Sequence, residues 1–216
     1  MYKRQELYDR EPDFWPIAEG FDADWIATHY PDPSTFIDAH RTLTVPVLLP
    51  SWGLASKGDY KLYHYAQNRA LTTYDIALGQ NPNGHKQEQG DNRTPEGEYH
   101  IIQKSTGPFE GTMGPWFGSA WMRLNYPNAF DAKAGLAAGK ISQQEHNRIV
   151  AAIKAGKEPP KTTKLGGGIG IHGWNGEWTP GFAQDLTWGC LSINNEPLKA
   201  FYKAAPLGTV LFIIPE

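Results

Sequence analysis

Glycine and proline are the feature of this sequence that most restricts its fold, with 23 and 17 of 216 residues. An average protein contains roughly 12% of these two residue types together, and here they make up nearly a fifth. Glycine is costly inside a helix or strand, and proline lacks a backbone N–H donor. The sequence therefore predicts many turns and short strands rather than a helical bundle.

The remaining composition is that of a folded domain. Hydrophobic residues make up 40% of the chain and charged residues 20%, enough for a sizeable core. The formal net charge of −3 argues against a strongly basic nucleic-acid-binding surface. No apolar run approaches 18 residues, so no membrane span is expected. The polar N-terminus does not resemble a signal peptide, which indicates either a cytoplasmic protein or a leader that is missing from this sequence.

The pattern of residue types divides the chain into two regions. We interpret residues 1–41 as an irregular, aromatic and proline-rich arm packed on the main body; the alternative is a partly disordered tail. After this arm, short segments rich in β-branched and aromatic residues are bounded by turn residues, which is typical of strands. We expect strands at residues 43–49, 61–66, 71–78, 98–103, 121–124, 166–172 and 209–214, with a hairpin turn at 66–70.

A helical hairpin is predicted as an insertion at about residues 129–157. Asp131 is expected to cap a short alanine-rich helix. Ser142 and Glu145 have the spacing of a capping box at the start of a second helix, and Gly156 fits its C-terminal end. A late helix is expected near residue 195, capped by Asn194 or Asn195. The predicted class is therefore mainly β with an α insertion.

The single cysteine, Cys190, excludes a disulfide within the chain and a cysteine-rich zinc site. His172 lies at the end of a predicted strand, separated from Cys190 by 17 residues. A histidine can take the proton of a thiol at neutral pH, and the resulting imidazolium would stabilise the thiolate. Taken alone this signal is weak, because a lone cysteine is more often a small core residue.

Glycine flanks both residues, which favours a functional interpretation because glycine in a strand often marks close backbone approach. Gly189 would let the chain turn around the sulfur, so that the backbone N–H groups of Trp188, Gly189 and Cys190 converge on a developing oxyanion. Gly173 would leave room for a substrate, and its carbonyl would fix the tautomer of His172.

Five segments in this order make the sequence resemble the L,D-transpeptidase catalytic domain, or YkuD family. The family pattern is a His-Gly segment followed, after a gap, by Ser/Thr-His-Gly-Cys. The resemblance extends over about residues 42–214 and rests on these segments: Arg93-Thr94-Pro95-Glu96-Gly97-Glu98-Tyr99, Asn125-Tyr126-Pro127-Asn128, the run from Lys164 to His172, Ile171-His172-Gly173 and Thr187-Trp188-Gly189-Cys190.

The resemblance implies a β-sandwich-like catalytic domain over residues 42–216 that acts on peptidoglycan stem peptides as donor and acceptor. Cys190 would attack the carbonyl of an L-D peptide bond, with His172 as base. A side-chain amine of a neighbouring stem would then form a cross-link, or a D-amino acid would exchange. The family uses no metal or cofactor, reacts with carbapenems, and works in the periplasm or cell wall, so the leader is expected to be missing.

Two departures from the family pattern concern the cysteine motif. Trp188 replaces its histidine, which leaves His172 as the remaining base. Ser192 stands where many relatives have arginine, so donor recognition is expected to differ, and Ser192 is a candidate substrate-binding residue. A variant donor such as L-alanine, which gives 1,3-type cross-links, would fit this change.

Several assignments stay open at this stage. Trp174 and Tyr126 either contact substrate or pack in the protein, Thr187 is expected to hydrogen-bond within the cysteine loop, and Asp185 is an alternative partner for His172. The same Cys–His pair would also serve an L,D-carboxypeptidase or endopeptidase that uses water as acceptor. A third possibility is a non-catalytic module that binds cell wall or glycan. The oligomeric state has no signature in the sequence.

Overall fold

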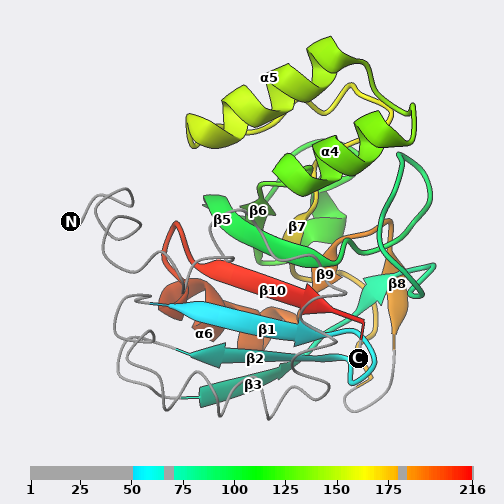
Figure 1. Ribbon diagram of the computed structural model, residues 1–216. Helices are drawn as coiled ribbons and strands as arrows, with labels where there is room; N and C mark the ends of the chain where they lie inside the picture. Colours follow the sequence, from blue (N-terminus) through cyan, green and yellow to red (C-terminus); the bar gives the residue numbers. More distant parts are fainter. Residues whose placement is uncertain (1–50, 66–70, 180–183, 216) are drawn as a thin grey trace.

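A computed structural model describes residues 51–65, 71–179 and 184–215 of the chain (Figure 1). Eight strands form one curled sheet in the order β3-β2-β1-β10-β5-β6-β7-β9, and β4 pairs with β8 in a second, two-stranded sheet. The strands are β1 (Trp52–Ser56), β2 (Lys61–Tyr65), β3 (Leu71–Asp75), β4 (Leu78–Gly79), β5 (Gly97–Thr106), β6 (Ala120–Leu124), β7 (Gly170–His172), β8 (Asp185–Thr187), β9 (Leu191–Ser192) and β10 (Val210–Ile214).

The centre of the large sheet is made from segments that are far apart in the sequence. β1 runs parallel to β10, with Trp52 opposite Val210, and β10 runs antiparallel to β5. All five residues of β1 and all five of β10 are buried. A continuous apolar run such as Val210–Ile214 is what a strand covered on both faces requires.

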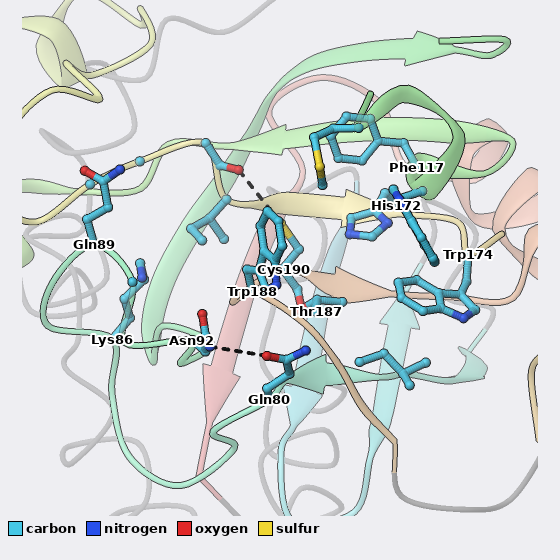
Figure 2. Close-up of a pocket in the computed structure, with 18 residues that line it drawn as sticks. Gln80, Lys86, Gln89, Asn92, Phe117, His172, Trp174, Thr187, Trp188 and Cys190 are labelled. Atoms are coloured by element: carbon cyan, nitrogen blue, oxygen red, sulfur yellow. Dashed lines mark hydrogen bonds between the residues drawn. The ribbon is translucent and has the colours of Figure 1, made fainter. Parts of the chain in front are cut away.

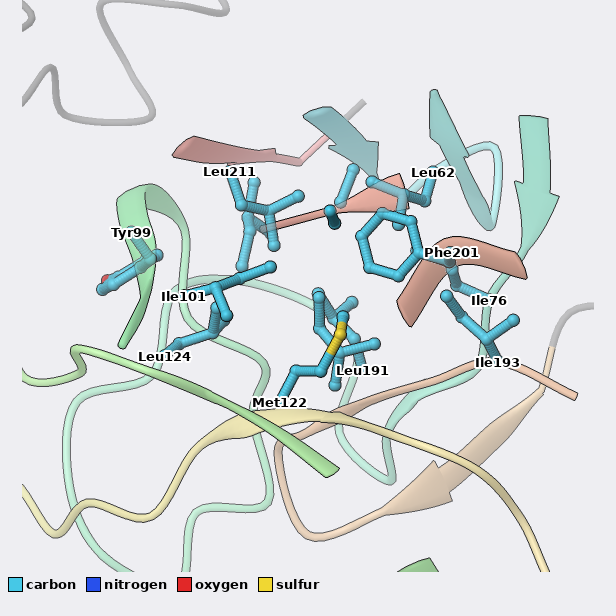
Figure 3. Close-up of a cluster of buried hydrophobic side chains, with 14 of the residues drawn as sticks. Leu62, Ile76, Tyr99, Ile101, Met122, Leu124, Leu191, Ile193, Phe201 and Leu211 are labelled. Atoms are coloured by element: carbon cyan, nitrogen blue, oxygen red, sulfur yellow. The ribbon is translucent and has the colours of Figure 1, made fainter. Parts of the chain in front are cut away.

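One face of this sheet is covered by the late helix α6 (Asn195–Ala204). Its buried residues Leu198 and Phe201 belong to the main hydrophobic core, and the ring of Phe201 packs edge-on against Tyr74 at 5.3 Å. Figure 3 shows Phe201 beside Leu62 and Ile76 in this core. Burial of large apolar side chains at this layer supplies the main stabilisation of the fold.

The predicted helical hairpin is present as α4 (Ala129–Ala137) and α5 (Gln143–Lys154), which Figure 1 shows at one end of the sheet. It has a small core of its own, made of Ala132, Ile141, Ile149 and Leu165. Asp131 anchors it to the sheet, because the Tyr99 hydroxyl donates to its carboxylate at 3.2 Å. A short 3-10 helix, Gly114–Phe117, precedes β6.

The mainly β fold with a helical insertion and a late helix is confirmed. The Ser142–Glu145 capping box forms as predicted, but Asp131 is not the cap of α4: Asn128 is, and Asp131 occupies the third position of a second capping box. The predicted strand over residues 166–172 is wrong in its first half. Gly166 and Gly168 have positive φ values of 77° and 72°, which an extended strand does not allow, so β7 begins only at Gly170.

The sequence analysis does not predict three of the observed strands, β1, β8 and β9. The predicted N-terminal arm, the strand at 43–49 and the hairpin turn at 66–70 lie outside the described residues. No helix within the described ranges is both long enough and apolar enough to cross a membrane.

Candidate active site

The two residues singled out for chemistry lie at the ends of neighbouring strands. His172 ends β7, and Cys190 immediately precedes β9; the two strands pair in parallel, with Ile171 opposite Leu191 and His172 opposite Ser192. Both side chains line one cavity of about 650 Å³ (Figure 2).

The cavity has an apolar and a polar side. Figure 2 shows Phe117 and Trp174 near His172 on one side of Cys190, and Lys86, Gln89 and Asn92 on the other. The complete lining is Gln80, Lys86, Gln89, Gly90, Asn92, Met113, Trp116, Phe117, Gly166, Gly167, Gly168, Ile169, His172, Trp174, Leu186, Thr187, Trp188 and Cys190. The arrangement suits a ligand with both apolar and polar groups.

His172 is held as a neutral base. Its Nδ1 atom lies 2.5 Å from the carbonyl oxygen of Gly173. Since that oxygen can only accept, Nδ1 carries the proton and Nε2 keeps a free lone pair. Burial, against the rings of Phe117 and Trp121, lowers the pKa of His172 to about 4. Gly173 thus orients His172 as predicted, whereas Asp185 accepts a hydrogen bond from Tyr60 at 2.9 Å and is not its partner.

The thiol of Cys190 is protonated at rest. Burial raises its pKa to about 11, and the backbone N–H of Gly170 and the charges of Lys86 and Arg123 only partly oppose this effect. The sulfur lies 3.8 Å from the carbonyl oxygen of Gly168, which can accept the S–H group. The expected thiolate–imidazolium pair is therefore not the resting state; the pair is neutral.

The loop before Cys190 is locked by Thr187, as predicted. The Thr187 hydroxyl donates to the carbonyl of Cys190 at 2.6 Å and accepts the N–H of Gly189 at 3.2 Å. Gly189 has a φ of +124°, and a Cβ there would lie 2.6 Å from the backbone oxygen of Arg93, so the position requires glycine. In this conformation the N–H of Gly189 already has a partner in Thr187, and its role as an oxyanion donor stays a prediction.

Gly173 offers no oxyanion donor either, because its N–H donates to the carbonyl of Phe117 at 2.9 Å. A Cβ at Gly173 would lie 2.1 Å from Oδ1 of Asn195, so close packing is the reason for glycine at this position. Trp188 is 63% exposed and lines the cavity, which excludes a role for its indole as a core anchor.

Of the three predicted substrate-binding side chains, the structure places only Trp174 in the cavity. Tyr126 is buried in the core, where its hydroxyl donates to the carbonyl of Leu165 at 3.1 Å. Ser192 is fully buried, and its hydroxyl donates to the carbonyls of His172 and Gly173 at 3.2 and 3.0 Å. Neither Tyr126 nor Ser192 lines the cavity, so their predicted role is not supported.

Two residues of the site carry no clear signal in the sequence. Asn195, expected to cap α6, instead accepts the N–H of Ser119 at 2.8 Å and donates to the carbonyl of Trp174 at 2.7 Å. Lys86 belongs to a polar segment whose sequence predicts only a loop, yet Lys86 lines the cavity. Among the residues that the structure describes, no group of three or more His, Cys, Asp or Glu side chains could hold a metal ion.

Comparison with solved structures finds proteins of similar fold. Two solved structures of the helical cell shape determining protein Pgp2 from Campylobacter jejuni are 22% identical over 78% and 77% of this chain, with TM-scores of 0.51 and 0.50. L,D-transpeptidase 1 from Mycobacterium tuberculosis is 12% identical, with a TM-score of 0.41, over 77% of this chain and 62% of its own.

This chain spans about half the length, 48%, of the two Pgp2 structures. A comparison with curated proteins finds no match. The family model of the L,D-transpeptidase catalytic domain, YkuD, matches residues 50–213, a stretch that includes both β7 and the Cys190 loop. The chain therefore belongs to the YkuD family of L,D-transpeptidase catalytic domains.

Proposed function

We propose that this chain is a peptidoglycan L,D-transpeptidase that works through an acyl-enzyme on Cys190. The observation that carries the proposal is that His172, at the end of β7, and Cys190, just before the adjacent parallel strand β9, line the same cavity. The donor is an L-D peptide bond of a stem peptide. Membership of a peptidoglycan-acting family implies a cell-wall or periplasmic location.

In the proposed first step, Nε2 of His172 takes the thiol proton while the sulfur attacks the carbonyl carbon of the L residue. His172 then gives this proton to the departing amine as the C–N bond breaks, and a thioester on Cys190 remains. The neutral state of both groups suits this step, because the base must be unprotonated before the reaction.

The tetrahedral intermediate needs backbone donors. We assign this role to the amides of Trp188 and Cys190, since the N–H of Gly189 is donated to Thr187. The positive φ of Gly189 turns the chain between these two amides. Preorganised donors of this kind typically contribute about 10²–10³-fold each to the rate.

The acceptor decides between two activities. A side-chain amine of a second stem gives a cross-link, and a free D-amino acid gives exchange. Water gives L,D-carboxypeptidase activity, which is the second candidate function. It is favoured by one observation: the described lining residues include no carboxylate that would attract an ammonium-bearing acceptor.

The test is to incubate the purified protein with disaccharide tetrapeptides and to identify the products by mass spectrometry. Cross-linked dimers support the transpeptidase, and tripeptide with free D-alanine but no dimer supports the carboxypeptidase. A donor ending in the L-Ala–D-Glu bond tests the variant linkage. If no substrate is turned over and a carbapenem leaves no mass adduct on Cys190, the enzymatic proposal is wrong and a binding module remains.

Substitutions of Cys190 and His172 test the proposed roles of nucleophile and general base. We expect Cys190→Ala to abolish turnover, because no nucleophile remains. His172→Gln should lower kcat/KM by about 10²–10⁴-fold, the usual contribution of a general base. Circular dichroism and thermal unfolding should show that both variants fold. Full activity of Cys190→Ala would rule out the acyl-enzyme.

A further inference from the structure

The residues that the structure describes around the cavity carry one fixed positive charge and no negative one. Among its described lining residues, Lys86 is the only side chain with a formal charge at neutral pH, since His172 is neutral. Asp91, the partner of Lys86, does not line the cavity. The one formal charge on the described lining is therefore that of the Lys86 ammonium group, which forms an ion pair with Asp91 behind the cavity wall.

The position of Lys86 is fixed by the loop around it. Its side chain is 4% exposed, and Nζ donates to Asp91 at 2.8 Å and to the carbonyl of Glu88 at 3.0 Å. Asp91 is held in turn by three backbone N–H groups, those of Gln87 at 2.7 Å, Glu88 at 3.1 Å and Arg93 at 3.1 Å. An ammonium group has three donors, and these contacts use two of them.

Neutral amide groups accompany this cation on the polar side of the cavity. Asn92 donates to the side chain of Gln80 at 3.2 Å, which fixes the direction of both amides, and Gln89 lies on the same side (Figure 2). A carboxylate entering such a site finds further possible donors and the Lys86 ammonium, which it would share with Asp91. An ammonium group finds no counter-charge among the described lining residues.

We propose that Lys86 is a specificity-determining residue that binds a carboxylate of the substrate, namely the free terminal carboxylate of the D-residue that leaves. This inference rests on the proposed function and deepens it. It makes the enzyme selective for stems that end immediately after the scissile bond, because an internal L-D bond carries an amide in place of that carboxylate.

A carboxylate on the side chain of diaminopimelate would offer the same chemistry, so the substrates must separate the two sources. The experiment compares three tetrapeptides: the free acid, its C-terminal amide, and the free acid with the diaminopimelate carboxylate amidated. For each, kcat/KM is measured with the wild-type enzyme and with Lys86→Gln. A charge-assisted hydrogen bond corresponds to roughly 10–100-fold.

We expect the wild-type enzyme to prefer the free acid over the C-terminal amide by about 10–100-fold, and Lys86→Gln to reduce this ratio to near one. The ratio is taken within one protein preparation, so a smaller folded fraction of a variant does not alter it. Lys86→Arg, which keeps the charge, should keep much of the preference. The matched control is Lys140→Gln, because Lys140 hydrogen-bonds to Gln87 of the same loop but does not line the cavity.

An unchanged acid-to-amide ratio in Lys86→Gln would overturn the inference, as would a preference that follows only the diaminopimelate carboxylate. Calorimetry of the same peptides with Cys190→Ala, with and without Lys86→Gln, measures the preference for the free acid in the absence of turnover. Equal binding of acid and amide to Cys190→Ala overturns the inference. Selective, Lys86-dependent binding by a wild-type protein that turns over none of these peptides would support the inference and reject the proposed function.

Discussion

At rest, Cys190 is a neutral thiol and His172 is a neutral imidazole. An ion pair would require the pKa of the thiol to lie below that of the imidazole. Here burial moves the two values apart in the opposite direction, to about 11 for Cys190 and about 4 for His172. The proton must therefore leave the sulfur during attack on the substrate, with His172 acting as a general base.

This state predicts an unusual pH dependence of alkylation by iodoacetamide, which reacts with the thiolate. Between pH 6 and pH 9 the rate constant for Cys190 should rise about tenfold per pH unit without a plateau, because the thiolate fraction rises up to the pKa near 11. The measurement is the loss of free thiol by intact mass at each pH, in the folded protein.

The matched control for this prediction is the urea-unfolded protein, whose thiol should level off near its ordinary pKa of about 8.5. A rate in the folded protein that is already constant from pH 5 to pH 8 would demonstrate a thiolate–imidazolium pair, and the general-base step proposed above would be wrong.

At the residue scale, the sequence predicts contacts between residues that are close together in the chain. The Gly173 carbonyl and the Thr187 hydroxyl act on residues within three positions of themselves, and both contacts form. Burial is set by distant segments and is not visible in a motif. Tyr126 and Ser192 therefore matched substrate-binding positions in sequence, yet both lie in the interior.

Among the elements, Asn195 at the start of α6 joins the loop after β7 to the loop before β6. The side-chain amide of Asn195 accepts the backbone N–H of Ser119 and donates to the backbone carbonyl of Trp174. The Ser119 hydroxyl in turn donates to the backbone carbonyl of Asn195 at 3.2 Å. The segment it holds includes Gly173, whose carbonyl orients His172. We interpret Asn195 as a positioning residue that acts on the reaction through this loop.

We expect Asn195→Ala to lower stability by about 2 kcal/mol, since it leaves two partly buried backbone groups unpaired. For a domain of this size that corresponds to a fall in Tm of roughly 4–8 °C. The acid limb of the kcat/KM profile should also shift, because the Gly173 carbonyl is less firmly held and the environment of His172 changes.

Asn194→Ala is the matched control, since the side chain of Asn194 makes no capping hydrogen bond with α6. It should change the free energy of unfolding by no more than about 0.5 kcal/mol. Asn195→Asp keeps the acceptor for Ser119 but cannot donate to Trp174, so an intermediate effect is expected. A pH profile of Asn195→Ala identical to that of the wild type would leave Asn195 with a structural role only.

Elements with strong local signals were predictable, and those that depend on partners were not. The capping box at Ser142 and Glu145 and the apolar run of β10 can be recognised from a few neighbouring residues. β8 and β9 have three and two residues and exist only because neighbouring strands pair with them. The glycine run at 166–168 adopts positive φ values to form the cavity wall, which a strand pattern does not reveal.

For the whole molecule, two buried histidines connect stability to pH. Burial lowers the pKa of His64, as of His172, to about 4, and the Ser51 hydroxyl lies 2.7 Å from its Nε2 atom. From pH 6.5 down to pH 4, the unfolded chain binds a proton at each position that the native protein does not bind. The free energy of unfolding must therefore fall as the pH falls through this window.

Each histidine can contribute up to about 3 kcal/mol to this loss, from a pKa difference of about 2.5 units. His64→Gln removes one titrating group while leaving a side chain that can still hydrogen-bond to Ser51. We expect urea unfolding to show a smaller difference in free energy between pH 7.0 and pH 4.5 for His64→Gln than for the wild type. His172→Gln should flatten the dependence in the same way, although its effect on activity is quite different. Equal pH dependence in all three proteins would mean that both imidazoles titrate near their ordinary pKa in the native fold, and the lowered pKa of His172 would no longer stand.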